Sequence, residues 1–273
     1  MRAALACLLP ALARGALPPL PAYPGLRLRY ETDFEGPALD TSVFTAVDHF
    51  VQTPYAQVCY MADDVSVRDS LLVLTTRARG VDCVFHATGE SKGYSFTSGW
   101  VDTHGKLAVA DGMVEVSSRF PPAVERIWPA AWVIAAANNR DGLTGPSTCW
   151  PLTTELDIYE STGGLGRADA CASVHHGVAC NVDLGNAYGC VPHPADGSFH
   201  TWAVRWDAAA GYATWYLDGV PFHGSVAADA PVPSSVAFVV NTALAYFAGE
   251  GAPGVDAVGV EHAVDWVRFW EKA

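Results

Sequence analysis

Three carboxylates lie close together in the segment ELDIYE, at Glu155, Asp157 and Glu160. The acids alternate with aliphatic residues as they would in a strand, so Glu155 and Asp157 should project from one face and the aliphatic side chains from the other. Simple alternation would turn Glu160 to the apolar face. A β-bulge near Tyr159 would add one residue and return Glu160 to the acidic face. Because like charges disfavour ionisation, we expect at least one of these groups to have a raised pKa.

Two such carboxyl groups suit the cleavage of a glycosidic bond. One attacks the anomeric carbon and the other protonates the departing oxygen, and in enzymes that form a covalent intermediate the two lie about 5–5.5 Å apart. Neighbouring same-face residues of a bulged strand predict this short separation, and with it retention of configuration. The alternatives are a solvated acidic strand, or a calcium site made of the three carboxylates.

The composition favours a neutral polymer as the partner. The chain has 273 residues, of which 50% are hydrophobic and 16% charged, as expected for one domain with a sizeable core. The formal net charge is −13 and no run of Lys or Arg stands out, which excludes nucleic acid and anionic membranes as expected partners. The nine Trp and ten Tyr could stack on sugar rings, although most should fill the core.

The first residues are typical of a signal peptide. Arg2 precedes an apolar run that ends in Ala11-Leu-Ala13, a small-x-small pattern like those before cleavage sites. We therefore expect a signal peptide over residues 1–16, a single catalytic domain over 17–273 and a secreted protein. An Ala-rich leader with no export role is the alternative. No later apolar run is long enough to span a bilayer.

The cysteines agree with export. Cys7 lies in the leader, and an even number remains, which favours disulfides in an exported protein but leaves the pairing open. Three of them fall between residues 171 and 190, where bonds could staple a long loop. Buried free thiols are the alternative. The six are Cys59, Cys83, Cys149, Cys171, Cys180 and Cys190.

Apolar runs of strand length recur along the chain, separated by Gly, Pro, Asp and Asn. They are rich in Val, Trp, Tyr and Phe, and long amphipathic helical patterns are absent. Asp218-Gly219 follows one run directly and predicts a tight hairpin turn. The pattern predicts an all-β sandwich or barrel, and a curved sandwich with a groove on its concave face would suit a polymer. The predicted strands are 70–76, 112–120, 130–136, 201–206, 212–217, 235–240 and 263–270.

From about Tyr30 to Trp270 the chain resembles glycoside hydrolase family 16, the laminarinase and lichenase superfamily. ELDIYE matches the family signature Glu-x-Asp-x-x-Glu in the longer, bulged form of the laminarinases. The other matching segments, in family order, are DFEG from Asp33, GMVEVSSRFP from Gly112, IWPAAW from Ile127, WP at Trp150, SVHHG from Ser173, FHTW from Phe199, WYLDG from Trp215 and VDWVRF from Val264.

The resemblance implies a concanavalin-like β-jelly-roll sandwich with a substrate groove on its concave sheet. It implies that Glu155 is the nucleophile and Glu160 the general acid/base, and that Asp157 forms a hydrogen bond near the nucleophile and tunes its charge through the two steps. Trp128 and Trp132 would line the sugar subsites.

The resemblance also implies that His175 lies near the acid/base and contacts sugar or Glu160, and that Asn241 binds substrate. Plainer roles remain open: core packing for Trp132, a structural role for His175 and backbone contacts for Asn241. Catalysis in this family needs no cofactor. Some members hold a structural calcium, for which Asp265 would be a ligand here. We expect a monomer.

The sequence departs from the family pattern at several positions. Thr154 replaces the Gly that usually precedes the first glutamate, Ser117 replaces a basic residue, and Asp111 replaces an aromatic one. The late Gly-Gly-Trp motif is replaced around Tyr246 and Phe247. These changes affect the expected groove walls, and hence substrate preference, more than the chemistry.

The predicted function is endo-hydrolysis of β-1,3-glucan, or of mixed β-1,3/1,4-glucan, with retention of configuration. One alternative is a cell-wall transglycosylase, in which a sugar instead of water resolves the same intermediate. The other is a non-catalytic β-glucan-binding protein, although such proteins typically lack the glutamates that this chain keeps.

Overall fold

The computed structural model of the chain is almost entirely β. It has a single 3-10 turn, η1 (Ala62–Asp64), and no α-helix within the described residues. The predicted signal peptide, Tyr246 and Phe247 lie outside those residues. No helix in the described part is long and apolar enough to cross a bilayer. The described residues are 17–19, 21–52, 56–85, 89–121, 126–137, 149–161, 169–180, 182–185, 189–194, 196–226, 232–244 and 258–273.

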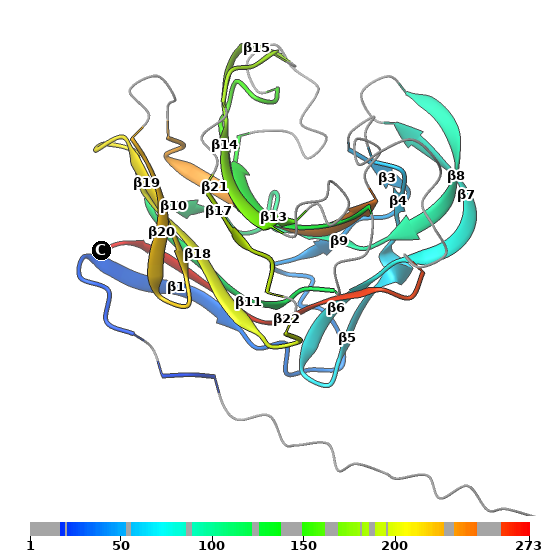
Figure 1. Ribbon diagram of the computed structural model, residues 1–273, viewed down its shortest axis with the longest axis horizontal. Coiled ribbons are helices and arrows are strands. Elements are labelled where there is room, and N and C mark those ends of the chain that lie inside the picture. Colours follow the sequence, from blue (N-terminus) through cyan, green and yellow to red (C-terminus); the bar gives the residue numbers. More distant parts are fainter. Residues whose placement is uncertain are drawn as a thin grey trace, which may run out of the picture.

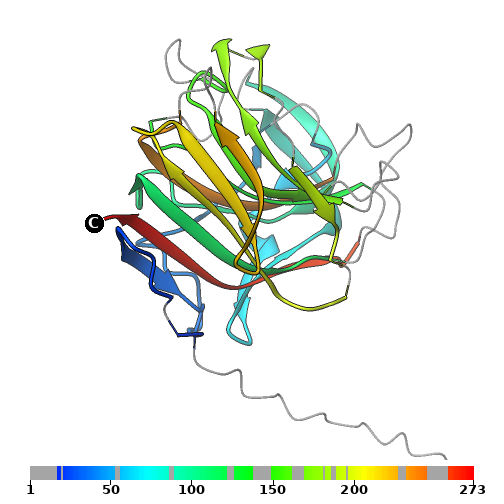
Figure 2. The ribbon, with the colours of Figure 1, turned by 60° about the vertical axis from the view of Figure 1, so that its left-hand side comes forward.

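Two eight-stranded antiparallel sheets pack face to face (Figure 1). Strands β11, β18, β19 and β22 of the first sheet run side by side in Figure 2. In spatial order, the first sheet holds β20 (Val220–Val226), β19 (Tyr212–Leu217), β18 (His200–Asp207), β11 (Gly112–Arg119), β22 (Glu261–Lys272), β6 (Leu71–Thr75) and β5 (Val65–Arg68), with β1 (Leu26–Thr32) beside β22. The second holds β17 (Gly189–Pro192), β14 (Asp169–His175), β13 (Glu155–Ser161), β12 (Ile127–Ala135), β21 (Ser235–Leu244), β9 (Trp100–Asp102) and β2 (Thr45–Ala46), with β10 (Val109–Ala110) beside β21.

This arrangement confirms the predicted β-jelly-roll sandwich, and each predicted strand overlaps an observed one. The Asp218-Gly219 turn is also confirmed. Both residues have positive φ, 50° and 76°, and they join the paired strands β19 and β20. Positive φ at both central residues is what a two-residue type I′ hairpin turn requires.

The main core lies between the sheets. The first sheet contributes fully buried indoles from Trp202, Trp206 and Trp215, and the second contributes aliphatic and aromatic side chains that include Ile158 and Tyr159. Side chains on a strand alternate between faces, so the remaining residues of the second sheet point away from this core.

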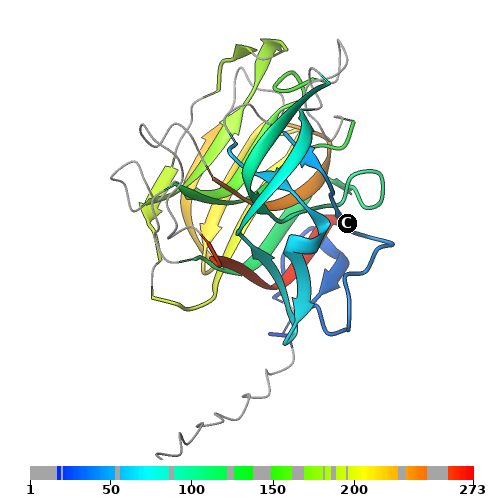
Figure 3. The ribbon, with the colours of Figure 1, turned by 90° about the vertical axis from the view of Figure 1, so that its right-hand side faces the viewer.

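A smaller arm packs on that other face of the second sheet. It is a closed ring of β3 (Phe50–Val51), β4 (Cys59–Tyr60), β8 (Glu90–Ser98) and β7 (Arg77–Phe85), seen in cyan and blue in Figure 3. Phe50 and Tyr60 of the arm lie 5.3 Å and 5.1 Å from the Trp100 ring, and Trp100 lies 5.4 Å from Trp132. Aromatic side chains of the arm therefore pack against this face of the second sheet at Trp100, which in turn contacts Trp132.

All six cysteines after the leader form disulfides, which confirms the expectation and settles the pairing. Cys59–Cys83 joins β4 to β7, and Cys171–Cys190 joins the neighbouring strands β14 and β17. Cys149–Cys180 ties the segment before β13 to the hairpin of β15 (Gly177–Ala179) and β16 (Val182–Asp183).

The segment before β1 is attached to the outer face of the first sheet. The Tyr23 hydroxyl donates to Glu115 Oε1 at 2.6 Å, and the buried Arg268 donates to the carbonyl oxygen of Pro18. The C-terminal Ala273 N–H donates to the Gly25 carbonyl at 3.0 Å. Pro18 and Tyr23 thus lie on the face opposite the second sheet, whereas Ala273 extends the pairing of β22 with β1.

Candidate active site

A bulge in β13 gathers the three acids on one face, as predicted. Pairing with β12 skips Ile158, and pairing with β14 shifts between Asp157 and Glu160. Ile158 and Tyr159 are both fully buried in the core between the sheets. Two consecutive residues therefore point inward, and Glu160 returns to the face that carries Glu155 and Asp157.

Tyr159 anchors the bulge through its hydroxyl group. That hydroxyl donates to Ser118 Oγ at 2.8 Å and lies 2.8 Å from His262 Nε2, both in the first sheet. His262 Nδ1 in turn lies 3.1 Å from Thr242 Oγ1, in the second sheet. A buried phenol needs such partners, so the network fixes Tyr159 inward and with it the position of the bulge.

Thr154 directly precedes β13 and has a left-handed conformation, with φ of 46°. Glycine adopts this region readily, whereas a β-branched residue is strained there. This explains why a Gly is expected at the position. The buried Thr154 hydroxyl also has no hydrogen-bond partner within the described residues.

Burial and mutual repulsion raise the pKa values of both glutamates. Burial, then the charge of Asp157, raises the pKa of Glu160 to about 8, although the Trp128 indole donates to Glu160 Oε1 at 2.9 Å. Burial and the same charge raise the pKa of Glu155 well above its usual value, opposed in part by His175. The expectation of a raised carboxyl pKa is confirmed. Glu155 Oε2 is buried without a hydrogen-bond partner in the described part of the chain.

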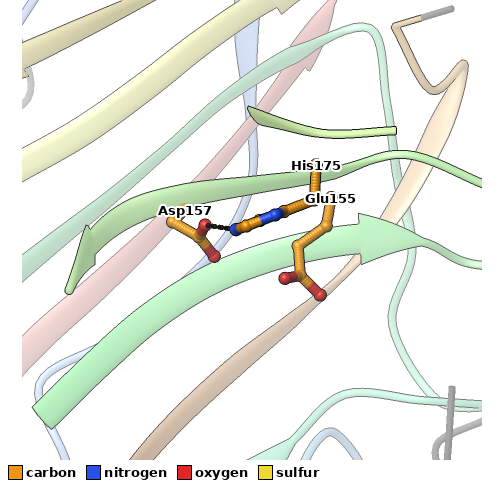
Figure 4. A group of neighbouring side chains, drawn as sticks. All are labelled: Glu155, Asp157 and His175. Atoms are coloured by element: carbon orange, nitrogen blue, oxygen red, sulfur yellow. Dashed lines mark ion pairs between the residues drawn. The ribbon is translucent and has the colours of Figure 1, made fainter. Parts of the chain in front are cut away.

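His175 lies between two carboxylates. Its Nε2 is 3.1 Å from Asp157 Oδ2, and its Nδ1 is 2.7 Å from Asp183 Oδ2. Figure 4 shows the ring reaching from β14 to Asp157, with Glu155 beside them. Burial alone would lower the pKa of His175. Hydrogen bonds to Asp157 and Asp183, together with the charges of Asp157 and Glu155, outweigh burial and raise that pKa far above its usual value.

The group Glu155, Asp157 and His175 offers three ligand atoms within 4.8 Å of one another, and it is the one such group found among the described residues. A metal would need a lone pair on His175. Both ring nitrogens already face carboxylate oxygens, which requires a proton on each. The donor set therefore fits an ion-paired cluster better than a metal site.

Asp265, the expected calcium ligand, does not join this cluster. It lies in the first sheet at a bulge of β22, where Ser117 pairs with Trp266 and Ser118 with Val264. A calcium ion held by Asp265 remains a prediction.

The other predicted substrate residues divide into two kinds. Trp128 is partly exposed and its indole donates a hydrogen bond to Glu160, and its contact with a sugar remains a prediction. Trp132 is 5% exposed and donates to Asn241 Oδ1 at 2.8 Å, while the Asn241 amide donates to the Tyr60 hydroxyl at 3.1 Å. Trp132 and Asn241 thus lie on the same face of the second sheet as Trp128. They form a hydrogen bond with each other, and Asn241 forms another with Tyr60 of the arm.

Four further residues surround the acids without having been predicted as site residues. The Ser173 hydroxyl donates to Asp157 Oδ2, and the Trp215 indole donates to the Asp157 carbonyl oxygen at 2.7 Å. The Trp150 ring lies 5.6 Å from that of His175, and Asp183 binds the same histidine. Ser173 could have been inferred from its register opposite Asp157, but Asp183 lies beyond β14 and had no such signal.

No protein-family model matches the sequence. The chain is 24% identical over 288 aligned residues to the glucan endo-1,3-β-glucosidase A1 of Niallia circulans, an alignment that covers 92% of the chain and 39% of that relative. The chain thus spans less than half the length of this curated relative.

Solved structures share the fold over nearly the whole chain. One of the endo-acting O-glycanases that human gut bacteria express to initiate mucin breakdown superposes with a TM-score of 0.76 at 21% identity, covering 93% of this chain and 94% of the other. SCLam, a non-specific endo-β-1,3(4)-glucanase from family GH16, gives 0.70 at 19% identity, covering 94% and 95%. The chain therefore has the fold of the laminarinase-type members of glycoside hydrolase family 16.

Proposed function

We propose that the chain is a retaining endo-β-glucanase that hydrolyses β-1,3-glucan or mixed β-1,3/1,4-glucan. The observation that carries this proposal is the pair of glutamates on one face of β13, with Asp157 between them and the pKa of Glu160 raised to about 8. A carboxyl group that keeps its proton at neutral pH can serve as a general acid.

The coupling between the acids suits two different roles. Each ionised carboxyl makes the next harder to ionise, so at neutral pH the cluster can hold one charged and one protonated glutamate. The buried Oε2 of Glu155, which has no hydrogen-bond partner in the described part, is available to attack the anomeric carbon. Trp128 holds Oε1 of Glu160, which orients the proton donor.

In the first step, Glu155 would form a bond to the anomeric carbon while Glu160 gives its proton to the departing glycosidic oxygen. In the second step, Glu160 would take a proton from water as that water attacks the same carbon and releases Glu155. The separation of the carboxyl groups in such enzymes is short, as the bulged strand predicts.

The substrate class rests on the relatives. The Niallia circulans protein is named a glucan endo-1,3-β-glucosidase, and SCLam is described as acting on β-1,3(4)-glucan. We also propose that the protein is secreted, with residues 1–16 as its signal peptide, and that it acts as a monomer without a cofactor. Three disulfides support an oxidising compartment.

The test is incubation of the purified protein with laminarin and lichenan. We expect reducing ends to accumulate, products of intermediate length to appear first, and proton NMR to show the β-anomer before mutarotation. Failure to cleave either glucan would refute the substrate class, and early α-anomer would refute retention. Products longer than the substrate would indicate a transglycosylase.

A further inference from the structure

His175 has an acid on each side, and this geometry fixes its protonation. Ionised carboxylates only accept hydrogen bonds, and Asp183 Oδ2 and Asp157 Oδ2 lie 2.7 Å and 3.1 Å from the two ring nitrogens. A neutral imidazole would direct a lone pair at one of these oxygens. Both contacts are favourable only for the imidazolium, whose two N–H groups donate in opposite directions.

Asp183 is held in place from the hairpin side. Its Oδ1 accepts the Gly185 N–H at 3.0 Å, and the backbone of His176 also donates to the carboxylate. The Leu184 N–H donates to the His176 carbonyl oxygen at 2.7 Å, which brings the two sides of the hairpin together next to Asp183. The carboxylate is thus oriented before it meets His175.

A disulfide joins this hairpin to the segment that precedes β13. Cys149–Cys180 joins the hairpin to the residue before Trp150, whose ring lies 5.6 Å from that of His175. Gly177 approaches so closely that an added Cβ would lie 2.9 Å from Pro151. The ring of His175 is therefore enclosed by two segments that a covalent bond holds together.

We propose that Asp183 is a positioning residue for the reaction: it holds His175 by Nδ1 and so directs Nε2–H at Asp157, which fixes the middle carboxylate of β13 between the two glutamates. This inference rests on the proposed function. Asp157 Oδ2 then accepts from both His175 and Ser173, so its carboxylate cannot turn when charge moves between the glutamates.

The fixed positive charge also offsets the acids next to it. Three acids on one short strand would repel one another, and His175 opposes the rise in the pKa of both Glu155 and Glu160. Three acids lie beside His175. Glu155 and Asp157 are on β13, and Asp183 is on the hairpin. Asp183 thus keeps the counter-charge in place through both chemical steps.

The experiment compares Asp183→Asn with Asp218→Asn. Asn keeps the shape of the side chain but loses its charge. Asp218 makes the same kind of bond to His200 Nδ1, at 2.8 Å, on the surface of the first sheet, which makes it a matched control. We expect Asp183→Asn to lower kcat on laminarin on the order of 10- to 100-fold with little change in KM, because misplacing a reacting group costs rate. Asp218→Asn should leave both unchanged.

A second readout needs no substrate. In nitrogen-15 NMR of the histidine rings, we expect both nitrogens of wild-type His175 to be protonated at neutral and mildly alkaline pH, and Asp183→Asn to bring its deprotonation into that range. A neutral His175 in the wild type, or an unchanged kcat in Asp183→Asn, would overturn the proposal. Because the wild-type spectrum is independent of turnover, this arm remains decisive even where no β-glucan is cleaved and the proposed function fails. The wild-type spectrum also tests the protonation of His175 where Asp183→Asn does not fold.

Discussion

Two histidines lie against opposite faces of the second sheet, His175 on its own strand β14 and His262 on β22 of the first sheet, and their pKa values are shifted in opposite directions. His262 is fully buried between the sheets among Tyr159, Ser118 and Thr242, and burial lowers its pKa to about 3. His175 is also largely enclosed, but it meets two carboxylates, and its pKa is raised. Burial favours the neutral imidazole in both places, and only acidic partners reverse that preference.

The comparison teaches how one strand serves two purposes. At the bulge of β13, Tyr159 joins the neutral network and the next residue, Glu160, joins the charged one. The neutral network holds the backbone, and the charged one sets protonation for chemistry. If this division is correct, changes on the charged side should affect rate, and changes on the neutral side should affect stability.

The largest expected effect comes from the charged side. Glu155→Ala and Glu160→Ala should each lower kcat by several orders of magnitude, about 4–7 kcal/mol in the activation barrier, because a covalent and a proton-transfer step lose their group. Added azide should distinguish the two variants: Glu155→Ala should yield the α-glycosyl azide and Glu160→Ala the β-glycosyl azide. The exposed Glu35→Ala serves as the control. Equal loss at Asp157→Asn would contradict the separation of roles.

The pH dependence sharpens the assignment of the acid. Glu160 should lose its proton near its pKa of about 8, so kcat/KM should fall at higher pH, approaching tenfold per unit. Its folded pKa is raised, so its stabilising effect is complete below the unfolded pKa near 4.5 and is lost as pH rises through about 8. The thermal midpoint should therefore decline less over this range in Glu160→Gln. A wild-type profile that stays flat to pH 10 would contradict the assignment.

On the neutral side, the dependence of stability on pH should have the opposite sign. The folded pKa of His262 is lowered to about 3, so its contribution is present above the unfolded value of 6.5 and is lost as pH falls toward 3. His262→Gln does not titrate, so its stability deficit at pH 7 should shrink on acidification. Urea unfolding at pH 7 and pH 4 measures this, with exposed His49→Gln as the control. A deficit that grew at pH 4 would show that His262 is charged in the folded protein.

The smallest expected effect lies at the start of the strand. Thr154→Gly should raise the free energy of unfolding by about 1 kcal/mol, because glycine relieves the strain at φ of 46° and removes a buried hydroxyl without a hydrogen-bond partner in the described residues. Thr154→Ala removes the hydroxyl but keeps a Cβ, so it should gain less. Both are measured by denaturant unfolding. A loss of stability in Thr154→Gly would mean that the backbone is not strained there.

The sequence predicted the parts that depend on local pattern. Acidic and aliphatic residues alternate in ELDIYE, and strict alternation would turn Glu160 to the apolar face, which was enough to predict the bulge. Asp218-Gly219 was enough to predict a turn. Asp183 could not be found in this way, because its contact with His175 depends on how a hairpin folds back after β14. His262 is similar: it is distant in sequence from Tyr159 and meets it only when the sheets pack. Partners that come from other elements carry no periodic signal.

The attachment of the segment before β1 to the outer face of the first sheet has a practical consequence. The carbonyl oxygen of Pro18 accepts a hydrogen bond from Arg268, and the Tyr23 hydroxyl donates to Glu115, both on the side away from the acids. A solid support or carrier module joined to this segment would therefore lie on the face opposite the one proposed to bind polysaccharide. Protein tethered through this segment should keep access to an insoluble glucan.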